Sequence, residues 1–165
     1  MELFETMEKR FSCRKFKDKK ITEEELNKVL EAGRLAPTAC NYQPERIIVV
    51  ENPLVLEKLK SATKYTFDAK TLLVICHDSG ISWHRKDNVD HGIVDSSIVA
   101  THMVLAATAL NLGTCFVCSM NPVLIKEILG LSDTYVVDIL LPIGYKDEEK
   151  AHNTRKELSE LVKRV

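Results

Sequence analysis

The segment from Gly92 to Leu112 constrains the fold of this chain more than any other feature. Its apolar residues recur with helical spacing, yet they fall on nearly every face of the helix that they predict. These residues are Ile93, Val94, Ile98, Val99, Met103, Val104, Leu105 and Leu110. A helix that is apolar on nearly every face is buried around most of its circumference. The other elements of the chain must therefore surround it.

Further helices are predicted on both sides of this segment. Residues 2–9 form a short amphipathic pattern, and Thr22 with Glu25 makes a capping box that starts a second helix, which stops before Pro37. The inward faces are expected to carry Leu3, Phe4, Met7 and Phe11 in the first helix and Leu26, Val29, Leu30 and Leu35 in the second. Pro53 opens a short helix, and another runs from Pro122 to Leu129. The tail over 157–165 is helically spaced but short, so it needs a surface to dock against.

Apolar and β-branched runs predict buried strands over residues 46–50, 71–76 and 135–141, with a strand-like piece over 115–117. A long polar loop containing Trp83 follows the second strand. The chain shows no internal repeat and no flexible linker, and its 45% hydrophobic content is enough for one core. We therefore expect a single α+β domain over 1–165, with strands separated by helices or loops.

Charge and cysteine content exclude several classes of protein. The 23 basic and 24 acidic residues nearly cancel, so nucleic acid is not an expected partner. No apolar run approaches the roughly 20 residues of a membrane helix, and the first five residues lack the order of a signal peptide. The chain is expected to be soluble and cytoplasmic. Its five cysteines are expected to be reduced thiols.

Arg10, Ser12 and Arg14 alternate with apolar residues just after the first helix. In an extended segment the two guanidinium groups and the hydroxyl would line one face, because successive side chains point to opposite faces. Arginine can bind a phosphate through two parallel hydrogen bonds, so this face suits an anion. The alternative is that the basic residues cap the helix carbonyls or remain solvated.

Four motifs occur in an order that resembles the FMN-dependent nitroreductase family. The first is the segment Arg10-Phe11-Ser12-Cys13-Arg14-Lys15-Phe16, and the second is the loop from Ala36 to Pro44 before a buried strand. The third is the apolar helix with its exit at Gly113, and the fourth is Leu141-Pro142-Ile143-Gly144-Tyr145 followed by Arg155-Lys156. Together they span nearly the whole chain, and agreement by chance of all four is improbable.

The resemblance implies a three-layer α-β-α fold with a mostly antiparallel central sheet flanked by helices. It also implies a homodimer in which both chains build each FMN site and the apolar helix forms much of the interface. The cofactor-binding residues that it implies are Arg10, Phe11, Ser12, Arg14, Pro37, Thr38, Ala39, Asn41, Gln43, Cys118, Ser119 and Arg155. Arg10, Ser12 and Arg155 match the phosphate and ribityl ligands, and Arg14 matches a basic residue at the pyrimidine edge of the ring.

The resemblance implies two kinds of contact with the flavin ring. The loop over 37–43 matches a segment that reaches the flavin across the dimer interface, whereas Cys118 and Ser119 match backbone donors near flavin N5. Two departures place the substrate pocket in doubt: Glu45 stands where many relatives carry an aromatic residue, and the region after Phe67 is too short for extra lid helices.

The implied chemistry is a ping-pong hydride transfer from NADH or NADPH through the flavin to a nitroaromatic, quinone or similar small-molecule acceptor. No side-chain acid or base is required. The chain has no glycine-rich dinucleotide loop, so the donor would stack directly on the flavin. A flavoenzyme of the same fold with a specific substrate, acting in reductive dehalogenation or flavin modification, is the alternative, because a fold hosts many functions.

Other functional hypotheses rest on weaker patterns. Cys115 and Cys118 have the spacing of a redox dithiol, but on a strand their side chains would face oppositely. A non-catalytic flavin-binding module is a further alternative, and turnover would distinguish it from an enzyme. The histidines form no second ligand pair for a metal. His102 is expected to be a core or interface histidine, and the role of Trp83 is open.

Overall fold

The computed structural model describes residues 2–149 and 154–165. At the centre of this part of the chain lies a four-stranded sheet in the order β1-β2-β4-β3. Its strands are β1 (Glu45–Val50), β2 (Thr71–Asp78), β3 (Leu112–Thr114) and β4 (Tyr135–Tyr145). Every pairing in the sheet is antiparallel. Consecutive strands along the chain are joined through helices and loops rather than tight hairpins.

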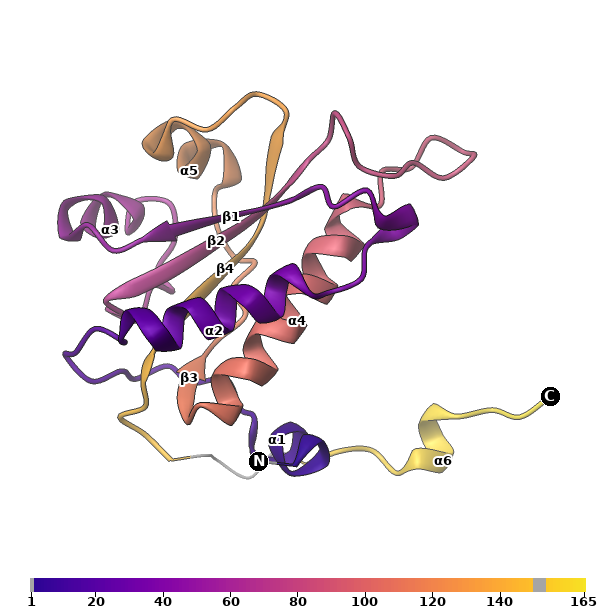
Figure 1. The fold of residues 1–165 in the computed structure, drawn as a ribbon, viewed down its shortest axis with the longest axis horizontal. Helices are drawn as coiled ribbons and strands as arrows, with labels where there is room; N and C mark the ends of the chain where they lie inside the picture. The colour runs from indigo at the N-terminus through magenta and orange to yellow at the C-terminus, as the bar shows by residue number, and fades with distance from the viewer. Residues whose placement is uncertain (1, 150–153) are drawn as a thin grey trace.

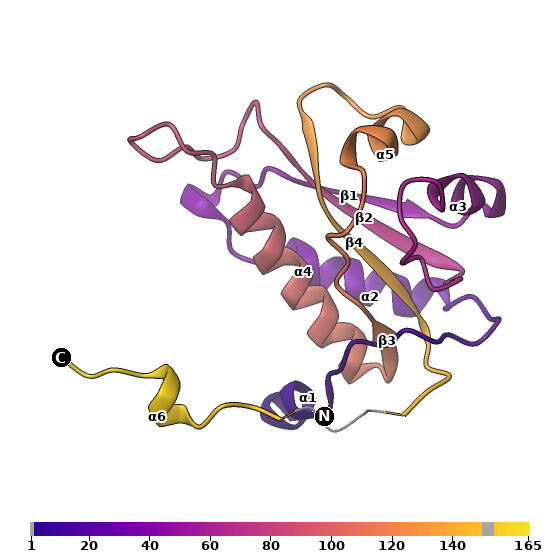
Figure 2. The ribbon, with the colours of Figure 1, turned by 180° about the vertical axis from the view of Figure 1, so that it is seen from behind.

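Helices cover both faces of the sheet, as Figures 1 and 2 show from opposite sides. One face is covered by α2 (Glu23–Arg34) and α4 (Gly92–Ala109), and the other by α3 (Pro53–Leu59) and α5 (Pro122–Leu129). Each face has its own hydrophobic cluster. The chain thus has the three-layer α-β-α architecture with an antiparallel sheet that the sequence predicts.

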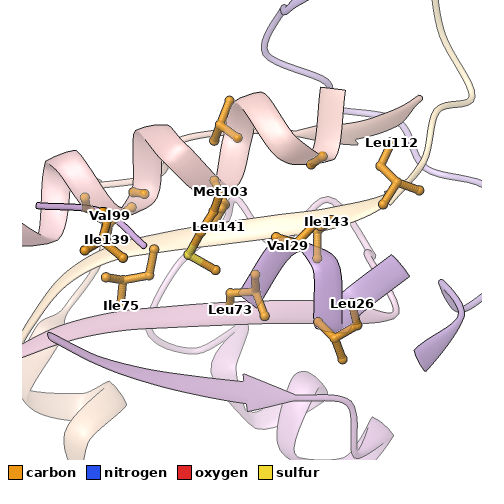
Figure 3. Close-up of a cluster of buried hydrophobic side chains, with 14 of the residues drawn as sticks. Leu26, Val29, Leu73, Ile75, Val99, Met103, Leu112, Ile139, Leu141 and Ile143 are labelled. Atoms are coloured by element: carbon orange, nitrogen blue, oxygen red, sulfur yellow. The ribbon is translucent and has the colours of Figure 1, made fainter. Parts of the chain in front are cut away.

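The two central strands are buried on both faces because their side chains alternate. Leu73 and Ile75 of β2 pack against α2 and α4, whereas Leu72 and Val74 pack toward α3 and α5. Figure 3 shows the first of these clusters, in which Met103 of α4 lies over the sheet. All five of these side chains have no exposed surface. Burying one such side chain stabilises the fold by about 1.5–3 kcal/mol.

The capping box at the start of α2 is present and also ties the helix to the sheet. The Glu25 amide donates to the Thr22 hydroxyl at 3.2 Å, and the Thr22 amide donates to the Glu25 carboxylate at 2.9 Å. The same carboxylate accepts a 2.7 Å hydrogen bond from the hydroxyl of Tyr145 at the end of β4. These hydrogen bonds hold the Glu25 pKa below its ordinary value.

Burial of α4 is less complete than its sequence predicts. One face lies on the sheet and α2, but Ile93 and Val94 on the other face are 54% and 46% exposed. The helix is also long and apolar enough to cross a membrane by length and composition, contrary to the expectation that no run approaches this limit. Half of it is buried inside the chain. Because a core helix passes the same test, this property alone does not indicate a membrane span.

The two ends of the described chain present apolar side chains to solvent. In α1 (Leu3–Lys9), Leu3, Phe4 and Met7 are exposed and Thr6 is the buried residue, so the predicted inward face is wrong for the single chain. The tail carrying α6 (Leu158–Leu161) extends away from the body of the protein in Figures 1 and 2. Its helix is only four residues long, and nothing in the described chain covers it.

Some predicted boundaries also differ from the structure. The apolar helix ends at Ala109, and the strand that follows it is Leu112–Thr114 rather than 115–117. Residues 115–117 contribute a single bridge, between Val117 and Leu140. Leu35 caps α2 and is 64% exposed instead of facing inward. Helix and strand ends depend on tertiary hydrogen bonds, which periodicity does not encode.

Leu73→Ala is expected to lower the free energy of unfolding by about 2–5 kcal/mol, because it leaves a cavity between β2 and α4. Leu54→Ala is the matched control, since Leu54 is 75% exposed on α3, and it should change stability by less than about 0.5 kcal/mol. Urea denaturation followed by circular dichroism measures both. Equal losses in the two variants would contradict the assignment of Leu73 to the core.

Candidate functional site

The segment carrying Arg10, Ser12 and Arg14 runs in an extended conformation beside the edge strand β3. The Cys13 amide donates to the Thr114 carbonyl at 2.9 Å, and Ser12 forms a parallel bridge with Thr114. Cys13 is fully buried, whereas Arg10 and Ser12 are half-buried and Arg14 is exposed. The alternation predicted from sequence is therefore present at Cys13, which is buried between the less buried Ser12 and Arg14, whereas Phe11 is half-buried like its polar neighbours.

Gly113 allows this close approach of the segment to β3. A Cβ atom at this position would lie 2.6 Å from the Cys13 Sγ atom and 2.8 Å from its Cβ atom. Real side chains do not make contacts this short, so any larger residue would push the segment away from the strand. The close packing of a glycine against a cysteine thus fixes where Arg10, Ser12 and Arg14 lie.

Arg14 lies between Ser12 and a cavity that Cys115 also lines. The Arg14 guanidinium donates to the Ser12 carbonyl at 3.5 Å, and Arg14 and Cys115 share the cavity wall. Burial raises the pKa of Cys115, and the Arg14 guanidinium, Ser12 and the Arg10 guanidinium offset this rise in part, whereas the Glu148 carboxylate, which accepts a hydrogen bond from the Arg14 amide, adds to it. A guanidinium group beside a cavity is a suitable donor for an anion.

Arg14 also lines two cavities that meet around the segment after α3. The smaller, of about 200 Å³, has Arg14, Tyr65, Phe67, Cys115, Phe116, Val117, Cys118 and Ser119 in its wall. The larger, of about 580 Å³, shares Arg14 and Phe67 with it. The structure thus brings Cys118 and Ser119 next to Arg14, as the resemblance implies.

Several residues around these cavities were missed by sequence reasoning. Lys15, Lys60 and Lys64 line the larger cavity together with Arg14, and Asp68 and Asp147 oppose them. The Lys60 ammonium group lies 2.9 Å from the carboxylate of Glu57 and 2.9 Å from that of Asp68, and these two ion pairs raise the pKa of Lys60. The only signal in the sequence is a pair of lysines four residues apart, which no motif distinguishes from surface lysines.

A hydrogen bond fixes the loop after α3 to the strand-like piece near the cavity. The Thr63 hydroxyl donates to the Ser119 carbonyl at 2.9 Å. Thr63 is buried, so the contact is protected from water. The loop after α3 therefore helps to fix the backbone that carries Cys118 and Ser119.

The loop over 37–43 has a strained and well-supported backbone. The φ angles of Cys40, Asn41 and Gln43 are 52°, 55° and 51°. Residues other than glycine rarely adopt positive φ angles. The Gln43 amide donates to the Thr38 hydroxyl at 3.0 Å. The Ala39 amide donates at 2.9 Å to Asp95, which is 1% exposed in the first turn of α4. Strain that is held by several hydrogen bonds is typical of functional loops.

The two predicted halves of the site lie at opposite ends of α4. The loop over 37–43 is attached to its first turn, whereas residues 10–14 lie beside β3, directly after its last turn. A helix of 18 residues is about 27 Å long. Arg155 lies on the extended tail, where its guanidinium donates to the neighbouring Thr154 carbonyl at 3.0 Å. A single chain therefore brings together Arg10, Ser12, Arg14, Cys118 and Ser119, but neither Pro37–Gln43 nor Arg155.

The structure gives no support to a dithiol formed by Cys115 and Cys118. Cys115 and Val117 face the hydrophobic cluster around α3 and α5, whereas Cys118 is exposed. All five cysteines are free thiols. Burial raises the pKa of Cys13 to about 11 and that of Cys76 to about 12, and it also raises the pKa of Cys115. Thiols of this kind are poor nucleophiles at neutral pH.

Comparisons with known proteins agree with this architecture. The model of the nitroreductase family matches residues 7–71 and 63–145. A protein of Archaeoglobus fulgidus, provisionally named an NADH dehydrogenase/NAD(P)H nitroreductase, is 32% identical over 86% of this chain and 83% of its own length.

Solved structures give the same result. A nitroreductase family protein of Clostridium difficile 630 superposes with a TM-score of 0.94 at 37% identity, covering 99% of this chain and 98% of that one. An FMN-dependent nitroreductase of Clostridium difficile R20291 superposes with a TM-score of 0.83 at 31% identity, covering 96% of each chain. The chain is therefore an α+β protein with the same three-layer fold as these structures. It belongs to the nitroreductase family.

The burial of Cys115 and the exposure of Cys118 predict different reactivity toward an aromatic disulfide reagent. Cys118→Ser should remove one rapidly reacting thiol from the folded protein, because the Cys118 side chain is open to solvent. Cys115→Ser should leave the number of rapidly reacting thiols unchanged, since the buried thiol with a raised pKa reacts only after unfolding. Loss of a fast thiol in both variants would instead support a reactive pair.

Proposed function

We propose that this chain is an FMN-dependent oxidoreductase that takes electrons from NADH or NADPH and reduces a nitroaromatic, quinone or similar small acceptor. The observation that carries the proposal is the extended segment beside β3 that carries Arg10, Ser12 and Arg14, with Arg14 in the wall of a cavity that Cys118 and Ser119 also line. Membership of the nitroreductase family supports it, as does the FMN-dependent relative at 31% identity.

The residues fit the chemistry of FMN from its phosphate to its ring. Arg10 and Ser12 would hold the phosphate, because a guanidinium and a hydroxyl together supply several donors to one anion. Arg14 would lie at the pyrimidine edge, where a cation stabilises negative charge on a reduced ring. Tyr65, Phe67 and Phe116 would supply apolar walls to the smaller cavity. When bound, FMN would supply the hydride-accepting ring, so no side chain needs to act as acid or base.

The remaining predicted ligands would come from a second copy of the chain. The loop over 37–43 and residues 10–14 are separated by the length of α4, which exceeds the reach of a small cofactor. A homodimer would bring the loop and Arg155 of one chain to residues 10–14 of the other. It would also cover the exposed apolar residues of α1, the outer face of α4 and α6, which solvent contacts in the single chain.

A cytoplasmic location and small-molecule substrates are part of the same proposal. NADH and NADPH are donors of the cytoplasm, and α4 packs against the sheet as a core helix. The choice between the two donors and the identity of the acceptor depend on the wall of the larger cavity, whose basic residues are Arg14, Lys15, Lys60 and Lys64.

Arg10→Ala and Arg155→Ala are each expected to weaken FMN binding by about 10- to 150-fold. The loss of one charge-assisted hydrogen bond to a phosphate costs about 1.5–3 kcal/mol. Arg34→Ala is the control, because Arg34 pairs with Glu31 on the exposed side of α2. Fluorescence titration of the apoprotein with FMN measures the affinity. Unchanged affinity in both Arg10→Ala and Arg155→Ala would refute the phosphate assignment.

Mixing two inactive variants tests whether two chains share each site. One chain carries Arg10→Ala and the other carries Asn41→Ala with Gln43→Ala. In a mixed dimer both defects fall in one site and the second site is intact, so NADH oxidation with a quinone acceptor should return after co-refolding. If each site belonged to one chain, every site would keep a defect and activity would not return.

A further inference from the structure

A buried histidine joins two acidic residues from different parts of the chain. His77, near the end of β2, is 5% exposed. Its Nδ1 atom lies 2.8 Å from the Asp138 carboxylate on β4, and its Nε2 atom lies 3.2 Å from the Asp90 carboxylate in the loop before α4. Each ring nitrogen therefore faces one carboxylate oxygen, which is the arrangement that suits an imidazolium with two N–H donors.

The first turns of α4 belong to the same polar cluster. The Ser96 hydroxyl donates to the Asp138 carboxylate at 2.6 Å, and the Gly92 amide donates to the Asp90 carboxylate at 2.8 Å. Gly92 lies directly against the imidazole, since a Cβ atom there would be 2.2 Å from the Cδ2 atom of His77. One imidazole thus connects β2, β4, α4 and the loop that precedes α4.

Residues 83–91 of this loop form a small hairpin whose base is at Asp90. His84 and Asp90 form an antiparallel bridge, and the Arg85 amide donates to the Val89 carbonyl at 2.9 Å. The rings of Trp83 and His91 pack edge to face with centroids 5.0 Å apart. The hairpin projects from the body of the protein in both Figure 1 and Figure 2. The contact of Asp90 with His77 therefore attaches its base to the sheet.

The hairpin lies beside the loop over 37–43 in both views. The Asp78 amide, next to His77, donates to the Pro44 carbonyl at 2.9 Å. Asp95, next to Ser96, accepts the hydrogen bond from the Ala39 amide. The residues that hold the hairpin and those that hold the loop are thus neighbours in sequence and in space.

We propose that His77 is a positioning residue for the acceptor site, because its contacts with Asp90 and Asp138 hold the hairpin over 83–91 beside the loop that faces the flavin ring. This inference rests on the proposed function, in which the loop over 37–43 contacts the ring. The hairpin then forms one wall of the space that the acceptor enters, and Trp83 lies on that wall.

The charges around His77 favour its protonated form. Burial alone lowers the pKa of His77, but the carboxylates of Asp138 and Asp90 outweigh burial and raise the pKa above its ordinary value. His84 lies 3.8 Å from Asp90, Asp78 is the next residue on β2, and Glu45 is the β1 partner of His77. The pKa of Asp90 is lowered, because hydrogen bonds and the charge of His77 outweigh its burial.

The sign of the pH dependence follows from the raised pKa. A group whose pKa is raised by folding stabilises the contact at low pH and loses this contribution as pH rises through the raised pKa. Once His77 is neutral, it has one N–H donor for two carboxylates. Alkaline pH should therefore loosen the hairpin at Asp90 before it affects the core.

Two aspartates of the hairpin give a matched pair of variants. Asp90→Ala removes the contacts with His77 and Gly92 at the base of the hairpin, whereas Asp87→Ala removes only contacts within the hairpin, namely the exposed pair with Arg85 and a long hydrogen bond of 3.5 Å from the Val89 amide. Asp90→Ala should increase amide hydrogen exchange over 83–91 and shift the emission of Trp83, the only tryptophan. The KM for a quinone acceptor should rise at least threefold with little change in kcat and in FMN content. Asp87→Ala should match the wild type in all five measurements.

A pH series on the wild-type protein adds a second test, with Asp90→Asn as its comparison. Hydrogen exchange over 83–91 in the wild-type protein, with or without FMN, should increase at alkaline pH beyond the intrinsic rate, and this increase should be absent in Asp90→Asn. Equal behaviour of Asp90→Ala and Asp87→Ala, faster exchange without a change in KM, or a pH series that is the same in wild type and Asp90→Asn would each refute the role of His77. A wild-type protein that binds no FMN would instead refute the proposed function, because the exchange measurements do not require the cofactor.

Discussion

The packing of α4 against β2 and β4 is the interaction on which the rest of the structure depends. Met103 and Val99 are fully buried between the helix and the sheet, and α2 closes the same cluster from the side. The two halves of the predicted site are attached to the ends of this helix. Its first turn accepts the loop over 37–43 through Asp95, and its last turn leads into β3, which pairs with the segment over 10–14. The core therefore also sets the positions of the site residues.

The two ends of α4 differ in the charges that lie beside them. At one end, the exposed guanidinium group of Arg14 lines a cavity, where it can bind an anion, and the Glu148 carboxylate accepts a hydrogen bond from the Arg14 amide. At the other end, an imidazole, a hydroxyl and an amide hydrogen-bond to the carboxylates of Asp90 and Asp138, and the Asp95 carboxylate accepts from the Ala39 amide through one of its two oxygens. The first end is thus suited to binding a ligand, and the second is suited to holding loops in place. Buried charges need such partners because desolvation is costly.

The fold was largely predictable because periodicity and strand alternation are local properties of the sequence. The capping box at Thr22 and the buried strands β2 and β4 were predicted correctly for this reason, whereas β1, also predicted to be buried, is an edge strand in which only Val50 is buried. The extended segment of Arg10, Ser12 and Arg14 followed from their alternation, whereas Lys60 and Lys64 have no local pattern and meet Arg14 only through tertiary structure. The inward faces expected for α1 and for Leu35 were wrong, because amphipathicity identifies an apolar face without saying what covers it. The polar cluster around His77 joins residues up to 61 positions apart, beyond what spacing can predict.

The length of α4 has a consequence for how this chain can vary. Each residue of a helix adds about 1.5 Å of rise and about 100° of rotation. One inserted or deleted residue between Asp95 and Leu112 would therefore turn the strand and the arginine segment at one end by more than a quarter of a circle relative to the loop at the other. Substitutions on α4 leave this geometry intact, whereas a change in its number of residues does not. The length of α4 therefore fixes both the distance and the angle between the loop over 37–43 and the segment over 10–14.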